Sequence, residues 1–353
     1  MDAGNNIPNK GKSELTQENP PNSCTIIMEH MLTQVRENRA IIYSLMSAIC
    51  YAGVSITAYE SSLYLTATEI PMWVALSVFC LTVVCILIKR PVFPSTIAEV
   101  MLIISSGIFC GGGGVCLLLA VVFVGPGDAI AIYYTMPVIC TILGITCFGE
   151  PMNVKKIILL CLAVVGASFI SGPTFLFGIP LSYNSMYAIG LVLALLASIG
   201  YGTSFTLIHY TSAKYETDPF IFSLATAASA SCFSTITYLV FQEPSFPSEI
   251  YGLLVLASCS CFSFLAGLSL AFALSVESAS FVAIVSTTEM LFTYLAQFIV
   301  FDLKPTWLSA SGAVMVFVSC VGLNFLKTDN GDAGIEDDDS KKPLIEDHKE
   351  ESK

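Results

Sequence analysis

Charge is the scarcest property of this sequence. Only 12% of its 353 residues are Asp, Glu, Lys or Arg, whereas a soluble globular protein averages about 25%. Hydrophobic residues make up 55% of the chain, and the mean hydropathy is +0.76. So little polar surface excludes a soluble enzyme and an intrinsically disordered chain. The net charge of −12 leaves no basic face, which excludes nucleic acid as a partner.

Residues for metal and nucleotide chemistry are also scarce. The chain has three histidines, and it contains no HExxH, CxxC or GxxxxGK[ST] motif. Of its thirteen cysteines, all except Cys24 lie in apolar runs, where cysteine serves as a small apolar residue. No His/Asp or Ser/His pairing occurs within these runs. We therefore expect no metal, no cofactor, no ATP-driven step and no enzymatic activity.

Long apolar runs dominate what is present. From residue 40 onward, ten stretches approach the ~20 residues that a membrane-spanning helix needs. They are 40–59, 67–88, 97–123, 128–148, 155–171, 187–209, 219–241, 250–274, 279–301 and 306–326. Backbone groups in lipid must bond internally, so we expect an all-α membrane protein with ten transmembrane helices. The 97–123 stretch is long, and its division is left open.

Basic residues indicate the orientation in the membrane. With the N-terminus in the cytoplasm, eight basic residues flank the cytoplasmic ends of the spans and only Lys304 lies on the other side. The even number of spans then makes both termini cytoplasmic. Residues 1–39 form a cytoplasmic segment in which 26–39 is an interfacial or a solvated helix. Residues 328–353 form an acidic, disordered tail. Plasma membrane and endomembrane are not distinguished.

The chain contains an internal duplication. Segment 137–150 runs from a mid-span residue to an acid at the end of the span, and segment 289–302 repeats this at an offset of 152 residues. The residues around Tyr51 recur around Tyr201 at an offset of 150. Each copy then holds five spans, and an odd number inverts the second copy in the membrane. Inverted repeats of this kind are typical of secondary transporters.

Several residues of the first copy resemble the EamA-type repeat of the drug/metabolite transporter superfamily: Asp128, Met136-Pro137-Val138, Glu150 and Gly166. Segment 172–178, Gly-Pro-Thr-Phe-Leu-Phe-Gly, resembles the G subgroup of the solute carrier 35 family. The resemblance implies a first repeat over 40–172 and a second over 187–327. It also implies ten helices as two inverted five-helix repeats, with a central cavity and alternating access. The second half matches less closely, since Glu289 stands at the position of the proline.

Glu289 is the main candidate for chemistry. It lies in the middle of predicted span 279–301, where an isolated carboxylate costs roughly 2.5–3.5 kcal/mol on insertion scales. The group must face a cavity, be paired or stay protonated. We interpret it as a proton-carrying or substrate-binding group. The alternative is a neutral acid that supports helix contacts by hydrogen-bonding to Thr287, Thr288 or Thr293.

Four tyrosines and a proline complete the predicted substrate site. Pro137 interrupts the fourth span beside Tyr133 and Tyr134 and frees a backbone carbonyl. A kink that only shapes helix contacts is the alternative. Tyr51 and Tyr201 occupy matching places in the two copies, so the repeat predicts that they face each other. A tyrosine at this depth needs a hydroxyl partner, which a cavity or a backbone carbonyl supplies.

The run of four glycines at 111–114 destabilises a helix, by about 1 kcal/mol per residue relative to alanine. Such a run is tolerated where backbones approach closely. The glycine run is consistent both with close approach of neighbouring helices and with a hinge in this span.

These features predict a secondary-active transporter of a small polar or anionic metabolite. It works by alternating access, with exchange or proton coupling. Its expected partners are a small-molecule substrate and the lipid bilayer, and a homodimer is left open. The alternative is a membrane regulator or scaffold that transports nothing.

Overall fold

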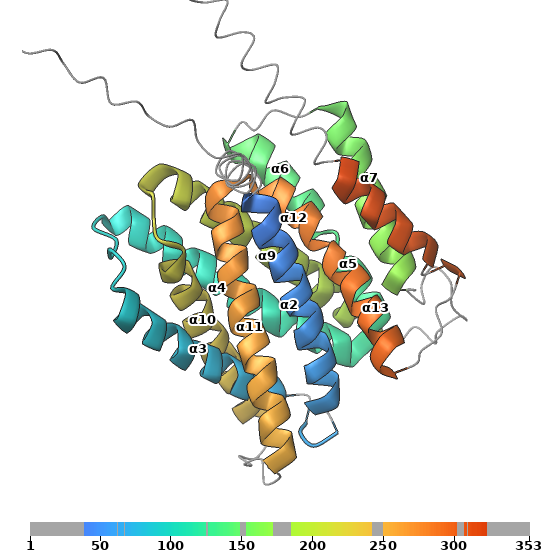
Figure 1. Cartoon of the computed structure of the whole chain (residues 1–353), viewed down its shortest axis with the longest axis horizontal. Helices are drawn as coiled ribbons and strands as arrows, with labels where there is room; N and C mark the ends of the chain where they lie inside the picture. The colour runs from blue at the N-terminus through green and yellow to red at the C-terminus, as the bar shows by residue number, and fades with distance from the viewer. Residues whose placement is uncertain are drawn as a thin grey trace, which may run out of the picture. The chain divides into compact units, whose positions relative to one another are not determined.

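The computed structural model describes residues 39–61, 63–66, 68–124, 126–148, 153–171, 185–241, 250–301, 307–308 and 310–322 (Figure 1). Every regular element in these ranges is a helix. The predictions for the N-terminal segment before Arg39, for Glu150 and Asp302, for the 172–178 motif and for the acidic tail lie outside the described residues.

Helices cover each of the ten apolar stretches. Those of the first half are α2 (Arg39–Ser61), α3 (Glu69–Lys89), α4 (Ile97–Val124), α5 (Pro126–Tyr133), α6 (Met136–Phe148) and α7 (Val154–Ser171). Those of the second half are α9 (Ser185–Tyr215), α10 (Pro219–Phe241), α11 (Ile250–Val276), α12 (Ala279–Ser286), α13 (Thr288–Phe301) and a final helix, Ala310–Gly322. In the described part of the chain, seven helical spans are long and apolar enough to cross a membrane. The predicted all-α architecture, with several helices of membrane-spanning length, is confirmed for the described residues.

Helix α3 shows how local chemistry sets the helix ends. Its first residue, Glu69, accepts a hydrogen bond from the backbone N–H of Thr66 at 2.8 Å. A carboxylate in the first turn satisfies a free amide and complements the helix dipole. The helix ends at Lys89, and the left-handed backbone of the capping residue Arg90 (φ 50°) stops the helical path before Pro91.

Two spans are interrupted at corresponding positions. A turn at Tyr134 and Thr135 separates α5 from α6, and Thr287 separates α12 from α13. Thr135 and Thr287 are 152 residues apart, which is the offset that the sequence repeat predicts. Pro137 follows the first interruption and is fully buried. Its missing N–H removes a helical hydrogen bond there.

The second interruption contains no proline. Instead, the hydroxyl of Thr287 donates to the carbonyl of Ile284 at 2.6 Å, and that of Thr288 donates to the carbonyl of Val285 at 2.7 Å. Threonine hydroxyls that bond to the preceding turn bend helices and weaken their backbone pattern. The break in the second half is thus accompanied by two adjacent threonines, whereas the break in the first half is accompanied by Pro137.

The most extensively packed helix pairs are α4 with α9 and α2 with α11, and Figure 1 shows α2 and α11 running side by side. Glycines of the 111–114 run bring α4 close to its neighbours. A Cβ atom on Gly111 would lie 2.8 Å from the backbone of Ser229 in α10. One on Gly113 would lie 3.2 Å from the ring of Tyr201 in α9. Close approach therefore accounts for these two glycines, whereas a Cβ on Gly112 would meet nothing within 4 Å.

Candidate functional site

A cavity of about 160 Å³ lies beside the interrupted spans. We call it the tyrosine cavity. Five of the six predicted site residues line it: Tyr51, Tyr133, Tyr134, Tyr201 and Glu289. They come from α2, the end of α5 and the turn after it, α9 and α13, so segments of both halves meet here. Pro137, the sixth predicted residue, is not among the lining residues.

Glu289 faces Tyr134 across the cavity. The hydroxyl of Tyr134 lies beside its carboxyl group, in position to donate to it. The sequence had offered neighbouring threonines as the alternative partners. The hydroxyls of Thr287 and Thr288 bond instead to backbone carbonyls. Glu289 thus lines the cavity together with residues of the opposite interrupted span, and none of the described lining residues is Lys, Arg or His.

The tyrosine rings pack edge to face. The ring centroid of Tyr133 lies 5.1 Å from that of Tyr134 and 5.2 Å from that of Tyr201, with interplanar angles of 71° and 79°. Offset and edge-to-face pairs are the favoured aromatic arrangements. Within the described ranges, the hydroxyls of Tyr51, Tyr133 and Tyr201 form no hydrogen bond. These three hydroxyls are available to a ligand.

A second cavity, of about 310 Å³, shares two residues with the first, Tyr51 and Tyr201. We call it the wide cavity. Its other walls come from α3, α4, α10 and α11, and most of the side chains there are small or carry hydroxyl groups, among them Gly111, Gly114, Ser223, Thr226, Ala227, Ala230, Ser234, Ser263 and Gly267. Sequence reasoning had singled out the glycines in this set but not the serines and threonines.

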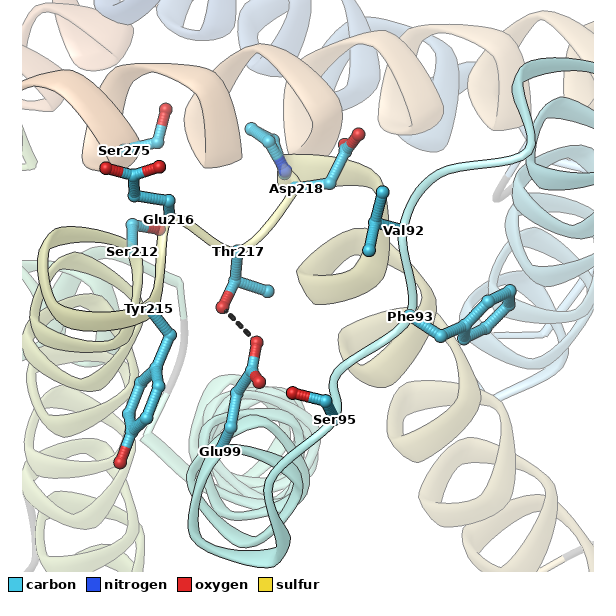
Figure 2. A pocket seen from close by; sticks show the side chains of 11 residues that line it. Val92, Phe93, Ser95, Glu99, Ser212, Tyr215, Glu216, Thr217, Asp218 and Ser275 are labelled. Carbon is cyan, nitrogen blue, oxygen red and sulfur yellow. Dashed lines mark hydrogen bonds between the residues drawn. The ribbon is translucent and has the colours of Figure 1, made fainter.

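A third cavity, of about 550 Å³, is acidic (Figure 2). Glu99, in the first turn of α4, is 6% exposed and accepts a 2.6 Å hydrogen bond from the hydroxyl of Thr217. Glu216 and Asp218, from the connection between α9 and α10, also line this acidic cavity. The hydroxyl of Ser212 is buried there without a hydrogen-bond partner. Sequence reasoning missed this group, although Glu99 in the first turn of an apolar span was a visible signal.

The model of the EamA-like transporter family matches residues 38–172 and 188–325 of this chain. Solute carrier family 35 member G1 of Homo sapiens is 24% identical over 284 residues, which span 80% of this chain and 78% of that protein. The same-named protein of Mus musculus is 22% identical over 80% and 77%. One crystal structure shares the fold with a TM-score of 0.67 at 14% identity, covering 81% of this chain and 98% of that chain.

Proposed function

The chain belongs to the EamA-like transporter family, and on this premise we propose that it is a secondary-active transporter of a small polar metabolite. As a family member it is an integral, multi-pass membrane protein, and its family and named relatives are transporters rather than enzymes. The observation that carries the proposal is the tyrosine cavity. It gathers polar side chains from helices of both halves, and a scaffold without a ligand needs no such cavity.

Two inverted repeats over 40–172 and 187–327 are part of the proposal, and the helix contacts support them. Exchanging the halves converts the pair α4 and α9 into the pair α11 and α2, and these are the two most extensive contacts. The last helices of the two halves also meet each other. A Cβ on Gly166 would lie 2.8 Å from the carbonyl oxygen of Gly312, and one on Gly312 would lie 2.5 Å from that of Gly166.

The position of the tyrosine cavity supports alternating access. Tyr51 and Tyr134 belong to the first half, and Tyr201 and Glu289 belong to the second. Rocking of one set of helices against the other would open a site between them to each side in turn. We also propose that both termini lie in the cytoplasm, as the distribution of basic residues predicts.

Glu289 is the proposed coupling group. Burial penalises the charged carboxylate more than the neutral acid, so the group takes up a proton when nothing else compensates its charge. A carboxyl group that gains and loses a proton as the cavity faces each side couples transport to a proton gradient. Exchange of substrate for substrate needs no net proton movement and is the second mode.

The test uses proteoliposomes that contain only this protein. A panel of labelled cationic, neutral and anionic small metabolites is offered to them and to protein-free vesicles. We expect time-dependent uptake of at least one compound into the protein-containing vesicles, with competition by the same compound unlabelled. Folded, monodisperse protein that takes up no compound would support the scaffold alternative.

A further inference from the structure

The charges around the tyrosine cavity are of one sign. Among the described residues that line it, Glu289 alone carries a formal charge, and the neutral hydroxyl of Tyr134 beside it does not neutralise that charge. The described lining residues of the adjoining wide cavity include no acidic or basic side chain. A ligand with a negative charge would meet Glu289 with no cation between them. A ligand with a positive charge would supply the missing counter-charge.

The aromatic side chains favour the same sign. The rings of Tyr134 and Tyr201 both pack edge to face against Tyr133, and all three residues line the cavity. The face of an aromatic ring is electronegative and attracts ammonium groups. Several rings beside one carboxylate resemble the aromatic cages that bind quaternary ammonium ligands. Tyr51 adds a fourth ring on the α2 side.

The volumes set the size of the group that fits. The tyrosine cavity, at about 160 Å³, corresponds to about five water molecules at their liquid volume. That volume suits a small ammonium head group rather than a whole metabolite. Because Tyr51 and Tyr201 line both cavities, the wide cavity adjoins the tyrosine cavity at these two side chains. The serine and threonine hydroxyls there suit an uncharged polar portion.

The acidic cavity lies toward one end of the same helices. Glu99 precedes Cys110, a lining residue of the wide cavity, by eleven residues of α4, which is roughly 16 Å along a helix. The residues described along the walls of the acidic cavity include no Lys, Arg or His. The three acidic residues of this cavity, Glu99, Glu216 and Asp218, attract cations and repel anions. The hydroxyl of Ser212, which has no hydrogen-bond partner among the described residues, offers a polar contact.

The acids do not form a metal site. Within the described part of the chain, no three His, Cys, Asp or Glu side chains come together in a way that could hold a metal ion. The carboxylates of the acidic cavity are therefore spread over its walls, and Glu289 stands alone among the tyrosines. This distribution fits an organic cation better than a metal ion.

We propose that the transported substrate is a small organic cation whose ammonium group sits in the tyrosine cavity against Glu289, with the acidic cavity as its approach. The inference rests on the proposed transport function and names its substrate class. It replaces the broader expectation of a polar or anionic cargo. The carboxylate and the ring faces hold the charged end, and the wide cavity holds the uncharged end.

Three probes of nearly the same shape test this proposal on purified protein. Choline carries the positive charge, 3,3-dimethylbutan-1-ol replaces its nitrogen with carbon, and 3,3-dimethylbutanoate carries a negative charge. Binding is measured by isothermal calorimetry and by the shift in unfolding temperature. We expect choline to bind at least tenfold more tightly than the neutral alcohol, and we expect no binding of the carboxylate. Equal or tighter binding of either isostere overturns the proposal, as does the absence of choline binding to folded protein.

Two variants locate the site. Glu289→Gln should weaken choline binding at least tenfold and leave the affinity for the alcohol unchanged. Tyr201→Leu should weaken choline binding by about tenfold, and Tyr201→Phe, which keeps the ring face, should weaken it much less. Unchanged choline binding in both Glu289→Gln and Tyr201→Leu overturns the assignment. If a variant does not fold, the three-probe comparison on the wild type still decides the charge preference.

The two proposals fail in different ways. If proteoliposomes take up anionic or neutral metabolites but choline neither binds nor competes, transport stands and the cation assignment falls. If choline binds by the expected pattern but no compound crosses the membrane, the cation site stands and the transport function falls.

Discussion

Tyr134 and Glu289 face each other from the two interrupted spans of the molecule, with the phenol hydroxyl of one beside the carboxyl group of the other. Tyr134 lies in the turn between α5 and α6, and Glu289 follows the break between α12 and α13. Both residues sit where the regular helical backbone is lost, next to the same cavity. A movement of one span relative to the other would therefore change the distance between the carboxyl group and the phenol.

A hydrogen bond from the hydroxyl of Tyr134 to the carboxyl group of Glu289 is expected to stabilise the fold. Tyr134→Phe removes the donor and leaves the carboxyl group without it, which should cost about 1–3 kcal/mol of unfolding free energy. Combined with Glu289→Gln, the double-mutant cycle should show a coupling of about 0.5–3 kcal/mol. Tyr133→Phe, whose hydroxyl has no partner within the described ranges, is the matched control. A coupling free energy of zero in this cycle would mean that the bond between Tyr134 and Glu289 does not stabilise the fold.

The glycine run allows a comparison of adjacent positions. Gly111→Ala would place a methyl group 2.8 Å from the α10 backbone, so α4 and α10 must separate at a cost of about 1–3 kcal/mol. Gly112→Ala meets nothing within 4 Å and should stabilise the helix by up to about 1 kcal/mol. Thermal unfolding in detergent measures both. Equal effects of the two substitutions would indicate that the helices do not approach closely here.

The acidic cavity offers a second matched pair. Thr217→Val removes the hydrogen bond to the buried carboxyl group of Glu99 and should destabilise the protein by about 1–3 kcal/mol. Thr217→Ser keeps the hydroxyl and should restore most of the loss. Ser212→Ala removes a buried hydroxyl that has no partner, so it should be neutral or stabilising. Thr217→Val at wild-type stability would contradict the importance of this contact.

The orientation of the chain can be tested in intact cells. Epitope tags placed after residue 2 and after residue 353 should bind antibody only once the membrane is permeabilised, because the distribution of basic residues predicts that both termini are cytoplasmic. A protein retained in internal membranes is examined after selective permeabilisation of the plasma membrane, which should then expose both tags. A lumenal or extracellular tag at one terminus would contradict an even number of spans.

The apolar stretches predict the helices well, because lipid permits few other backbone forms. The repeat offset also predicts that Tyr51 and Tyr201 come together, since matching positions of two related halves meet near the centre. Pro137 predicts a break in its span, although its side chain is buried beside the cavity rather than lining it. The break at Thr287 was not predicted, because no proline is present and threonine hydroxyls act through weaker local competition.

The acidic cavity was beyond sequence reasoning for a different reason. Glu99 and Thr217 are 118 residues apart, and no local pattern indicates that the start of α4 meets the connection between α9 and α10. Helix periodicity is also weak in a chain whose helices face lipid on one side and apolar neighbours on the other. Which faces meet, and therefore which polar groups converge, depends on small residues such as Gly111 and Gly113 and on the tertiary contacts that they permit.

The most direct test of proton coupling through Glu289 is the response of vesicle lumen pH to substrate. Proteoliposomes that contain a trapped pH indicator and only this protein are exposed to cationic, neutral and anionic small metabolites. We expect at least one compound to change the lumenal pH with the wild type and with Glu60→Gln, whose acid lines none of the three cavities. Glu289→Gln should give no change while still exchanging labelled substrate. A Glu289→Gln response equal to that of the wild type would contradict the account.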